Sequence, residues 1–187
     1  MTLRGQHVVL EPLTLEHVDG LVAAAAEDRS SYGFTHVPDS VATMAAYVEA
    51  ALGAGDQTPY AVVSGERVVG STRFMDTQCL LGPRPTVTEI GSTWYAASVQ
   101  RTAVNTECKL LMLTHAFESW AVQRVTLKTD ARNARSRTAI LRLGASFDGV
   151  LRRHSPAVDG GLRDTAFFSI LAEEWPAVRK GLLERLA

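Results

Sequence analysis

The segment Gln100–Glu107 brings together residue types that can hold an anion. It follows a strand-like run, places small and hydroxylated residues around the cationic Arg101, and leads into an apolar-periodic helix. A helix that begins after such a loop presents unpaired backbone N–H groups and a positive dipole end. Two more cations, Arg135 and Arg137, stand at the start of a later predicted helix. This pattern predicts a ligand that carries phosphate.

Asn133 and Ser136 form a second pair of interest, because a spacing of three residues places both on one face at the start of that later helix. The plainer interpretation is that Asn133 caps the helix and Ser136 faces solvent.

Glu89 is the carboxylate that stands in the strand before the phosphate-binding segment. Strand alternation puts one set of side chains on its face, namely Glu89, Gly91, Thr93 and Tyr95, and the other set on the opposite face, namely Ile90, Ser92 and Trp94. Gly91 favours a bulge or a close backbone approach, which would leave amides free to polarise a carbonyl group. The alternative is a glutamate at a strand end in a surface ion pair.

Apolar periodicity predicts the elements that position these residues, in the order β-α-α-β-β-β-α-β-α-β-β. The predicted strands are His7–Leu13, a hairpin of Tyr60–Val63 and Arg67–Gly70, then Thr86–Tyr95, Arg124–Asp130, Phe147–His154 and Leu162–Leu171. The predicted helices follow Thr14, start near Ser40, span Asn105–Ala121 and Asn133–Leu143, and start again at Trp175. In the helix Asn105–Ala121, Lys109 lies off the apolar stripe, and we expect Glu107 to point away from a bound phosphate.

Composition bounds the class of protein. The 187 residues are 46% hydrophobic and 21% charged, as in an ordinary globular domain. A net charge of −1 argues against nucleic acid or an anionic membrane as partner. Cys79 and Cys108 have neither metal-ligand nor disulfide spacing, and we expect no metal. There is no secretory signal and no membrane-length apolar run, so we expect a cytoplasmic protein.

Several of these segments together carry a family resemblance. They are Glu89–Trp94, Gln100–Glu107, Arg124-Val125, Asn133 with Ser136, Ile140–Ala145 and Arg163–Thr165. On them the chain resembles the GNAT superfamily of acyl-CoA-dependent N-acetyltransferases, and most closely the RimJ/RimL-type group that acetylates ribosomal-protein N-termini. The resemblance implies an α/β (α+β) fold in one domain over residues 1–187, with a mixed, mostly antiparallel sheet flanked by helices. It also implies acetyl-CoA as the cofactor.

By the same resemblance, a loop of the form Q/R-x-x-G-x-G/A holds the CoA pyrophosphate. Here Ala103 and Asn105 replace its two small residues, and Ala103 strains the turn only if its φ is positive. Asn133 is expected to bind the pantetheine arm, and Arg137 or Arg135 the 3′-phosphate. The expected cofactor-binding residues are Trp94, Gln100, Arg101, Thr102, Ala103, Val104, Asn105, Thr106, Asn133, Ser136 and Arg137.

The catalytic roles implied are a general base and a general acid. Amine acetylation needs a neutral amine, and Glu89 is the candidate that takes its proton, directly or through water. Ser136 either protonates the departing thiolate or only binds it. Trp94 is interpreted as a wall of the core or of the acceptor pocket rather than as a chemical participant.

The acceptor site is expected between the Ser31–His36 loop and the His154–Arg163 hairpin. Its expected substrate-binding residues are Tyr32, Phe34, His36 and His154, beside a basic rim of Arg152, Arg153 and Arg163. We therefore expect an N-acetyltransferase acting on a primary amine, either a protein N-terminus or a small molecule, with a homodimer as one possible assembly. Two alternatives stay open: a catalytically weak acyl-CoA-binding regulatory protein, and an acyltransferase that uses a bulkier acyl-CoA such as succinyl-CoA.

Overall fold

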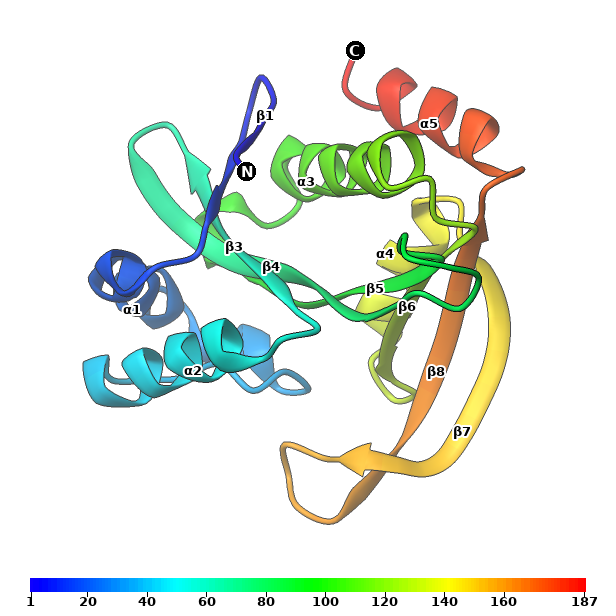
Figure 1. Cartoon of the computed structure of the whole chain (residues 1–187). Coiled ribbons are helices and arrows are strands. Elements are labelled where there is room, and N and C mark those ends of the chain that lie inside the picture. The colour runs from blue at the N-terminus through cyan, green and yellow to red at the C-terminus, as the bar shows by residue number, and fades with distance from the viewer.

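The computed structural model describes all residues 1–187 and is built on one eight-stranded sheet (Figure 1). The strand order is β1-β2-β3-β4-β5-β6-β8-β7, and every neighbouring pair is antiparallel except β5 and β6. The strands are β1 Leu3–Arg4, β2 Val9–Pro12, β3 Thr58–Ser64, β4 Arg67–Gln78, β5 Val87–Tyr95, β6 Arg124–Asp130, β7 Ser146–Pro156 and β8 Leu162–Leu171. The expected mixed, mostly antiparallel α/β fold is confirmed.

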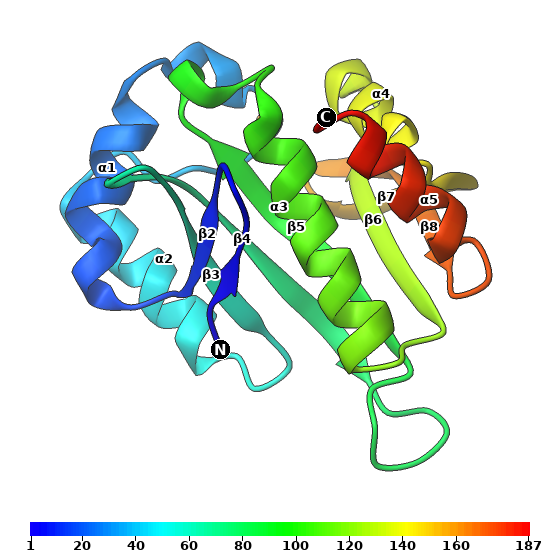
Figure 2. The ribbon, with the colours of Figure 1, turned by 90° about the horizontal axis from the view of Figure 1, so that it is seen from above.

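Helices cover both faces of this sheet. The α-helices are α1 Val18–Ala26, α2 Val41–Gly53, α3 Ala103–Thr114, α4 Ala134–Arg142 and α5 Trp175–Glu184. Short helical turns are η1 Leu15–His17, η2 Arg29–Tyr32, η3 Ala97–Val99 and the π-turn η4 His115–Ser119, which continues α3. Helices α1 and α2 lie under one face, and α3 lies across the other beside α5 (Figures 1 and 2). We call these the α1–α2 face and the α3 face.

The sheet splits between β5 and β6. These parallel strands pair at only three positions, where Val87, Thr88 and Glu89 lie opposite Arg124, Val125 and Thr126. Beyond Glu89 the two strands separate, while β5 continues along β4 and β6 continues along β8. The long hairpin β7–β8 curves beneath the sheet toward the α1–α2 side (Figure 1). The split therefore opens a V in the middle of the sheet, next to Glu89.

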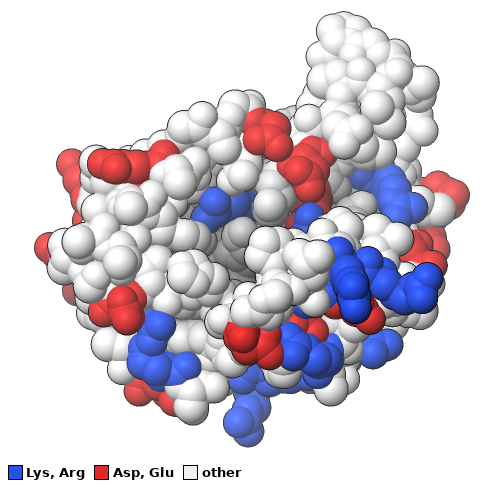
Figure 3. All heavy atoms as spheres, turned by 90° about the horizontal axis from the view of Figure 1, so that it is seen from below, with Lys and Arg blue, Asp and Glu red and all other residues white.

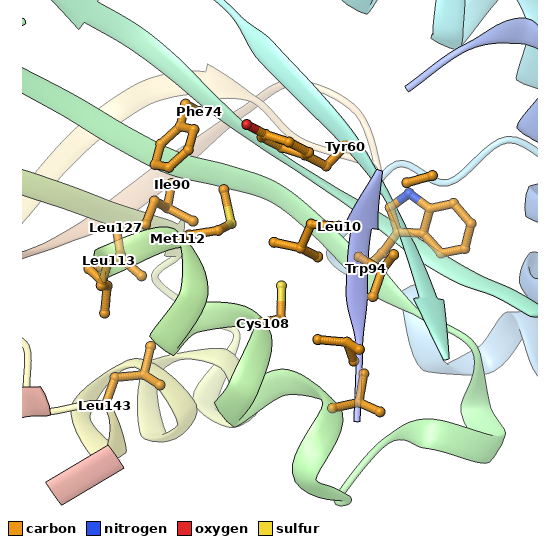
Figure 4. Close-up of a cluster of buried hydrophobic side chains, with 14 of the residues drawn as sticks. Leu10, Tyr60, Phe74, Ile90, Trp94, Cys108, Met112, Leu113, Leu127 and Leu143 are labelled. Atoms are coloured by element: carbon orange, nitrogen blue, oxygen red, sulfur yellow. The ribbon is translucent and has the colours of Figure 1, made fainter. Parts of the chain in front are cut away.

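The core that holds this frame joins the sheet to α3. Figure 4 shows Met112 and Cys108 of α3 among Leu10, Phe74 and Ile90 of the strands. Cys108 is fully buried, and burial raises the pKa of its thiol, so it is a small core thiol rather than a nucleophile. None of the helices is both long enough and apolar enough to cross a membrane.

Candidate active site

A bulge in β5 lies at the mouth of the V. On β4 the register passes from Ser71, opposite Trp94, to Arg73, opposite Gly91, so β5 has one residue more than β4 over this step. Ser92 carries the irregularity, with a left-handed φ of 47°. The bulge that Gly91 suggested is confirmed, although its strained residue is Ser92. A bulge takes backbone groups out of the ladder and leaves them free to bind a ligand.

The bulge also reverses the order of side chains beyond it, so the predicted faces of β5 are wrong after Gly91. Trp94 lies on the same face as Glu89 and packs edge-on against Tyr32, with ring centroids 5.9 Å apart. Thr93 is instead on the α3 face, where its hydroxyl accepts a hydrogen bond of 2.7 Å from Lys109 Nζ. The physical reason is that one inserted residue shifts the period-2 alternation by one position.

Glu89 stands at the point where β5 and β6 part. Its side chain is buried and its Oε2 lies 2.8 Å from Lys128 Nζ on β6, which also lies 3.4 Å from Asp76 Oδ2 at the end of β4. Burial raises the pKa of Glu89, although the ammonium of Lys128 pulls it down. The ion pair considered as the alternative is therefore present, but it is buried in the sheet rather than at the surface. A carboxylate with a raised pKa remains suited to accept a proton from an amine.

Gly91 makes room for this carboxylate. A Cβ atom at position 91 would lie 2.6 Å from Glu89 Oε1 and 2.8 Å from Met75 Sδ, distances that side chains do not tolerate. The free oxygen of Glu89 thus lies over the backbone of Gly91, directly beside the bulge. Sequence reasoning found Glu89 and Gly91 but missed Lys128 and Asp76. The only sequence signal for Lys128 was its place in β6, where it alternates with residues that are buried, namely Val125, Leu127 and Thr129.

The N-terminus of α3 has a geometry that suits an anion. Its N-cap is Thr102, whose side chain accepts a hydrogen bond from Val104 N at 3.3 Å, and the helix begins at Ala103, two residues before the predicted start. Four other amides at this helix start have no hydrogen-bond partner in the protein: those of Arg101, Thr102, Ala103 and Asn105. We call these four free N–H groups the cradle; at a helix N-terminus they suit the phosphates of acetyl-CoA.

The two departures from the family loop cause no backbone strain. Ala103 and Asn105 both lie inside α3, and neither is among the residues with positive φ. The left-handed residue of this loop is Arg101, with a φ of 62°. Glu107 turns away from the cradle as expected, because its carboxylate accepts hydrogen bonds from the amides of Gln6, His7 and Val8 at 2.8, 2.6 and 2.8 Å. Lys109, in contrast, is buried against β5 rather than exposed as its place off the stripe predicted.

The start of α4 faces the cradle across the V. Asn133 caps this helix, accepting from Ser136 N at 3.0 Å, and the Ser136 hydroxyl makes no hydrogen bond within the protein. Arg135 reaches across to Gln100 Oε1 at 3.2 Å and to the Ser31 carbonyl at 2.8 Å. Arg137 donates to the Ala131 carbonyl and lies 5.6 Å from the ring of Phe147. The structure therefore brings Gln100, Asn133 and Ser136 to one opening, while Arg137 is held beside β7.

The expected acceptor loop forms a pocket of about 330 Å³ with the β7–β8 turn. Tyr32 and His36 line it from one side and Val158 from the other. The Tyr32 hydroxyl donates to the Tyr95 carbonyl at 3.0 Å, so this ring also fixes the end of β5. Phe34 instead packs against Arg132, whose guanidinium carbon lies 5.3 Å from the centroid of the Phe34 ring. His154 lies on β7, and its Nδ1 is 3.2 Å from Thr165 Oγ1. Figure 3 shows the molecule hollowed on this side, with basic and acidic side chains at the walls.

Comparisons with known proteins agree with this geometry. The family model of the acetyltransferase (GNAT) domain matches residues 7–146. A candidate acetyltransferase from T. thermophilus is 33% identical, with a TM-score of 0.89 over 100% of this chain and 97% of that one. A GCN5-related N-acetyltransferase from Brucella melitensis is 31% identical, with a TM-score of 0.87 over 100% and 86%.

A more distant likeness concerns the fold alone. RimJ of Mycobacterium smegmatis, solved with a CoA disulfide, is 20% identical, with a TM-score of 0.82 over 99% of this chain and 93% of that one. No curated protein matches the chain. The match of the family model over most of the chain is decisive: the protein belongs to the GNAT family and is an acyl-CoA-dependent acetyltransferase that uses acetyl-CoA.

Proposed function

We propose that residues 1–187 form one N-acetyltransferase domain that moves an acetyl group from acetyl-CoA to a primary amine by direct transfer in a ternary complex. The single observation that carries this proposal is the position of Glu89, whose free Oε1 lies beside the β5 bulge at the mouth of the V. A proton acceptor and unpaired backbone groups are thereby held at one point between two opened strands.

Acetyl-CoA supplies the activated acetyl group, and the residues present fit it. The free amides of the cradle, from Arg101 to Asn105, would hold the pyrophosphate, with the side chains of Gln100 and Arg101 in the same segment. Asn133 and Ser136 would hold the pantetheine end from the α4 side, and Trp94 walls the site from the α1–α2 face. The reactive end would then lie along the gap between β5 and β6.

The chain's own residues then manage charge and protons. Glu89 takes the proton from the attacking amine, which needs a free lone pair. The backbone freed at Ser92 donates to the acyl carbonyl as negative charge develops on it. Lys128 keeps the Glu89 carboxylate oriented on the side of the amine. The hydroxyl of Ser136, free of protein partners, is available to the departing sulfur.

The experiment is a measurement of CoA release from acetyl-CoA with a panel of primary amines. We expect turnover with at least one amine and its loss in Glu89→Gln, with the acetyl-CoA dissociation constant unchanged. Glu66→Gln is the matched control, because Glu66 is exposed in the β3–β4 turn. Binding of acetyl-CoA without turnover of any amine would instead support the rival regulatory, acyl-CoA-binding role.

A further inference from the structure

Arg73 is a buried cation without an anionic partner. It lies on β4 with 6% of its surface exposed, and no carboxylate lies within ion-pair distance of it. One of its nitrogens, Nη1, donates to Gln57 Oε1 at 2.9 Å, and the guanidinium lies 4.6 Å from the centroid of the Tyr47 ring. Buried charges in proteins are as a rule paired. Arg73 therefore needs an explanation beyond packing.

The unpaired edge of Arg73 has a specific shape. Its Nε and Nη2 atoms are both buried and have no hydrogen-bond partner in the protein. These two nitrogens form one side of the guanidinium plane, the side that binds the two oxygens of a carboxylate in parallel. The Tyr47 hydroxyl and Trp94 Nε1 are also buried without a partner. Three groups that can donate hydrogen bonds thus lie unused on the α1–α2 face.

Arg73 also stands next to the proposed point of transfer. It lies directly opposite Gly91, on the face that carries Glu89, and Trp94 follows one pair further along. Glu89 does not neutralise Arg73, because its carboxylate is paired with Lys128. An anion bound at Arg73 would therefore belong to the molecule whose amine meets Glu89.

We propose that Arg73 binds a carboxylate of the acceptor, so that the substrate class is an amine that also carries a carboxylate, such as an amino acid. This proposal rests on the proposed function and specifies the class of amine that the enzyme acetylates. Because the Nε–Nη2 edge is covered, binding requires that the acceptor displace the side chains over it; within the protein only one hydrogen bond, to Gln57, holds the guanidinium.

The test compares amino acids with their carboxamides as acceptors, with rates corrected for the neutral fraction of each amine. For the wild type we expect kcat/KM to be about tenfold or more higher for the carboxylates, the effect of one charge-assisted contact. Arg73→Met should remove this preference and leave the rate with carboxamides and the KM for acetyl-CoA within about twofold, a small change on that scale. Arg73→Lys should keep part of the preference, and Arg142→Met, at an exposed arginine, should behave as wild type.

Two results would overturn the proposal. One is a wild type that does not favour carboxylates while it acetylates other amines, which leaves the proposed function standing. The other is an equal loss for both acceptors in Arg73→Met, which would mark Arg73 as structural. If no amine is acetylated, the proposed function fails. In that event the carboxylate site is tested by thermal shift with N-acetyl amino acids and with their amides, in the presence of CoA. Stabilisation by the acids that is lost in Arg73→Met supports the carboxylate site. No stabilisation by the acids refutes the site.

Discussion

At the scale of single residues, the proposed site is built around one carboxylate held between a cation and a backbone irregularity. Glu89 is buried, paired with Lys128 through Oε2, and turned toward Gly91 through Oε1. Burial and the ion pair act on its pKa in opposite directions, and burial has the larger effect. The Glu89 carboxylate is therefore more basic than that of a solvated glutamate.

The first prediction concerns Glu89 and pH. Because burial raises the pKa of Glu89 above its usual 4.5, kcat of the wild type should rise with pH through that raised pKa and then level off. Glu89→Gln should lower kcat by about 10²–10⁴-fold and remove this acidic limb, because the amide takes no proton. Steady-state kinetics between pH 5 and 9 measure both effects. An unchanged acidic limb in the variant would assign the titration to another group.

Gly91→Ala should act on catalysis through Glu89. The added Cβ would lie 2.6 Å from Glu89 Oε1, so the carboxylate has to move away from the bulge. A misplacement of about 1 Å costs on the order of 10²-fold in rate, while overpacking costs about 1–3 kcal/mol of stability. We therefore expect kcat to fall far more than thermal stability does. Gly53→Ala, where a Cβ meets nothing within 4 Å, is the control and should leave both unchanged. Full activity in Gly91→Ala would separate Glu89 from the chemistry.

At the scale of elements, the loop before α3 has two opposed requirements. Arg101 occupies a left-handed conformation that favours glycine, yet it is the one cation in the segment that carries the free amides of the cradle. Arg101→Gly should therefore stabilise the protein without ligand by roughly 0.5–1 kcal/mol, because the left-handed conformation costs a side chain about 1–2 kcal/mol. It should also weaken acetyl-CoA binding about tenfold, the effect of one charged contact.

The matched control for Arg101→Gly is Ala121→Gly. Ala121 is exposed and has a φ of 57°, and it lies at the other end of the helix that begins at Ala103. This variant should raise the melting temperature of the free protein to a similar extent and leave the acetyl-CoA dissociation constant unchanged. Calorimetry on the free proteins and titration with acetyl-CoA give the two quantities. Equal affinities in the two variants would show that the guanidinium of Arg101 does not bind the cofactor.

Helix α3 is also tied to the N-terminal hairpin by one carboxylate. The Glu107 carboxylate accepts three hydrogen bonds, from the backbone N–H groups of Gln6, His7 and Val8. Glu107→Ala leaves these donors unsatisfied and should destabilise the fold by about 2–4 kcal/mol. The melting temperature should then fall by roughly 4–16 °C, against almost no change for Glu49→Ala on the exposed face of α2. A drop no larger than that of the control would show that β1 and β2 do not depend on this contact.

Elements were more predictable from the sequence than the details that join them. The strand of Glu89 and the helix after Gln100 follow from periodicity, because their apolar spacing repeats over whole turns or pleats. The faces of β5 beyond Gly91 could not be predicted in this way, because the residue inserted at Ser92 does not change the spacing of apolar residues. Arg73 and Lys128 were missed for a similar reason: an isolated cation in a strand is buried or exposed according to what packs on it, and α2 and the split between β5 and β6 are tertiary features.

At the scale of the whole molecule, the proposed site draws its residues from both halves of the sheet. Strands β1–β5 carry Arg73, Glu89 and the loop to α3, and strands β6–β8 carry Lys128 and lead to α4. Contacts between the halves include three residue pairs of β5 and β6, the ion pair of Glu89 with Lys128, and Arg135, which binds Ser31 and Gln100. A ligand that lies in the V and contacts both halves should stabilise the whole fold.

That expectation gives the last prediction, which also separates the enzyme from a protein that only binds. At a ligand concentration about 100 times the dissociation constant, acetyl-CoA should add about 2.7 kcal/mol of stability and raise the melting temperature by roughly 5–11 °C. Pantetheine, which lacks the phosphates, should give a much smaller shift, because the cradle of free amides before α3 is then unused. Equal shifts with both ligands would contradict phosphate binding at the cradle, Arg101–Asn105. A full shift with acetyl-CoA but no CoA release with any amine would instead indicate a regulatory binding protein, since it would show an intact cofactor site without transfer.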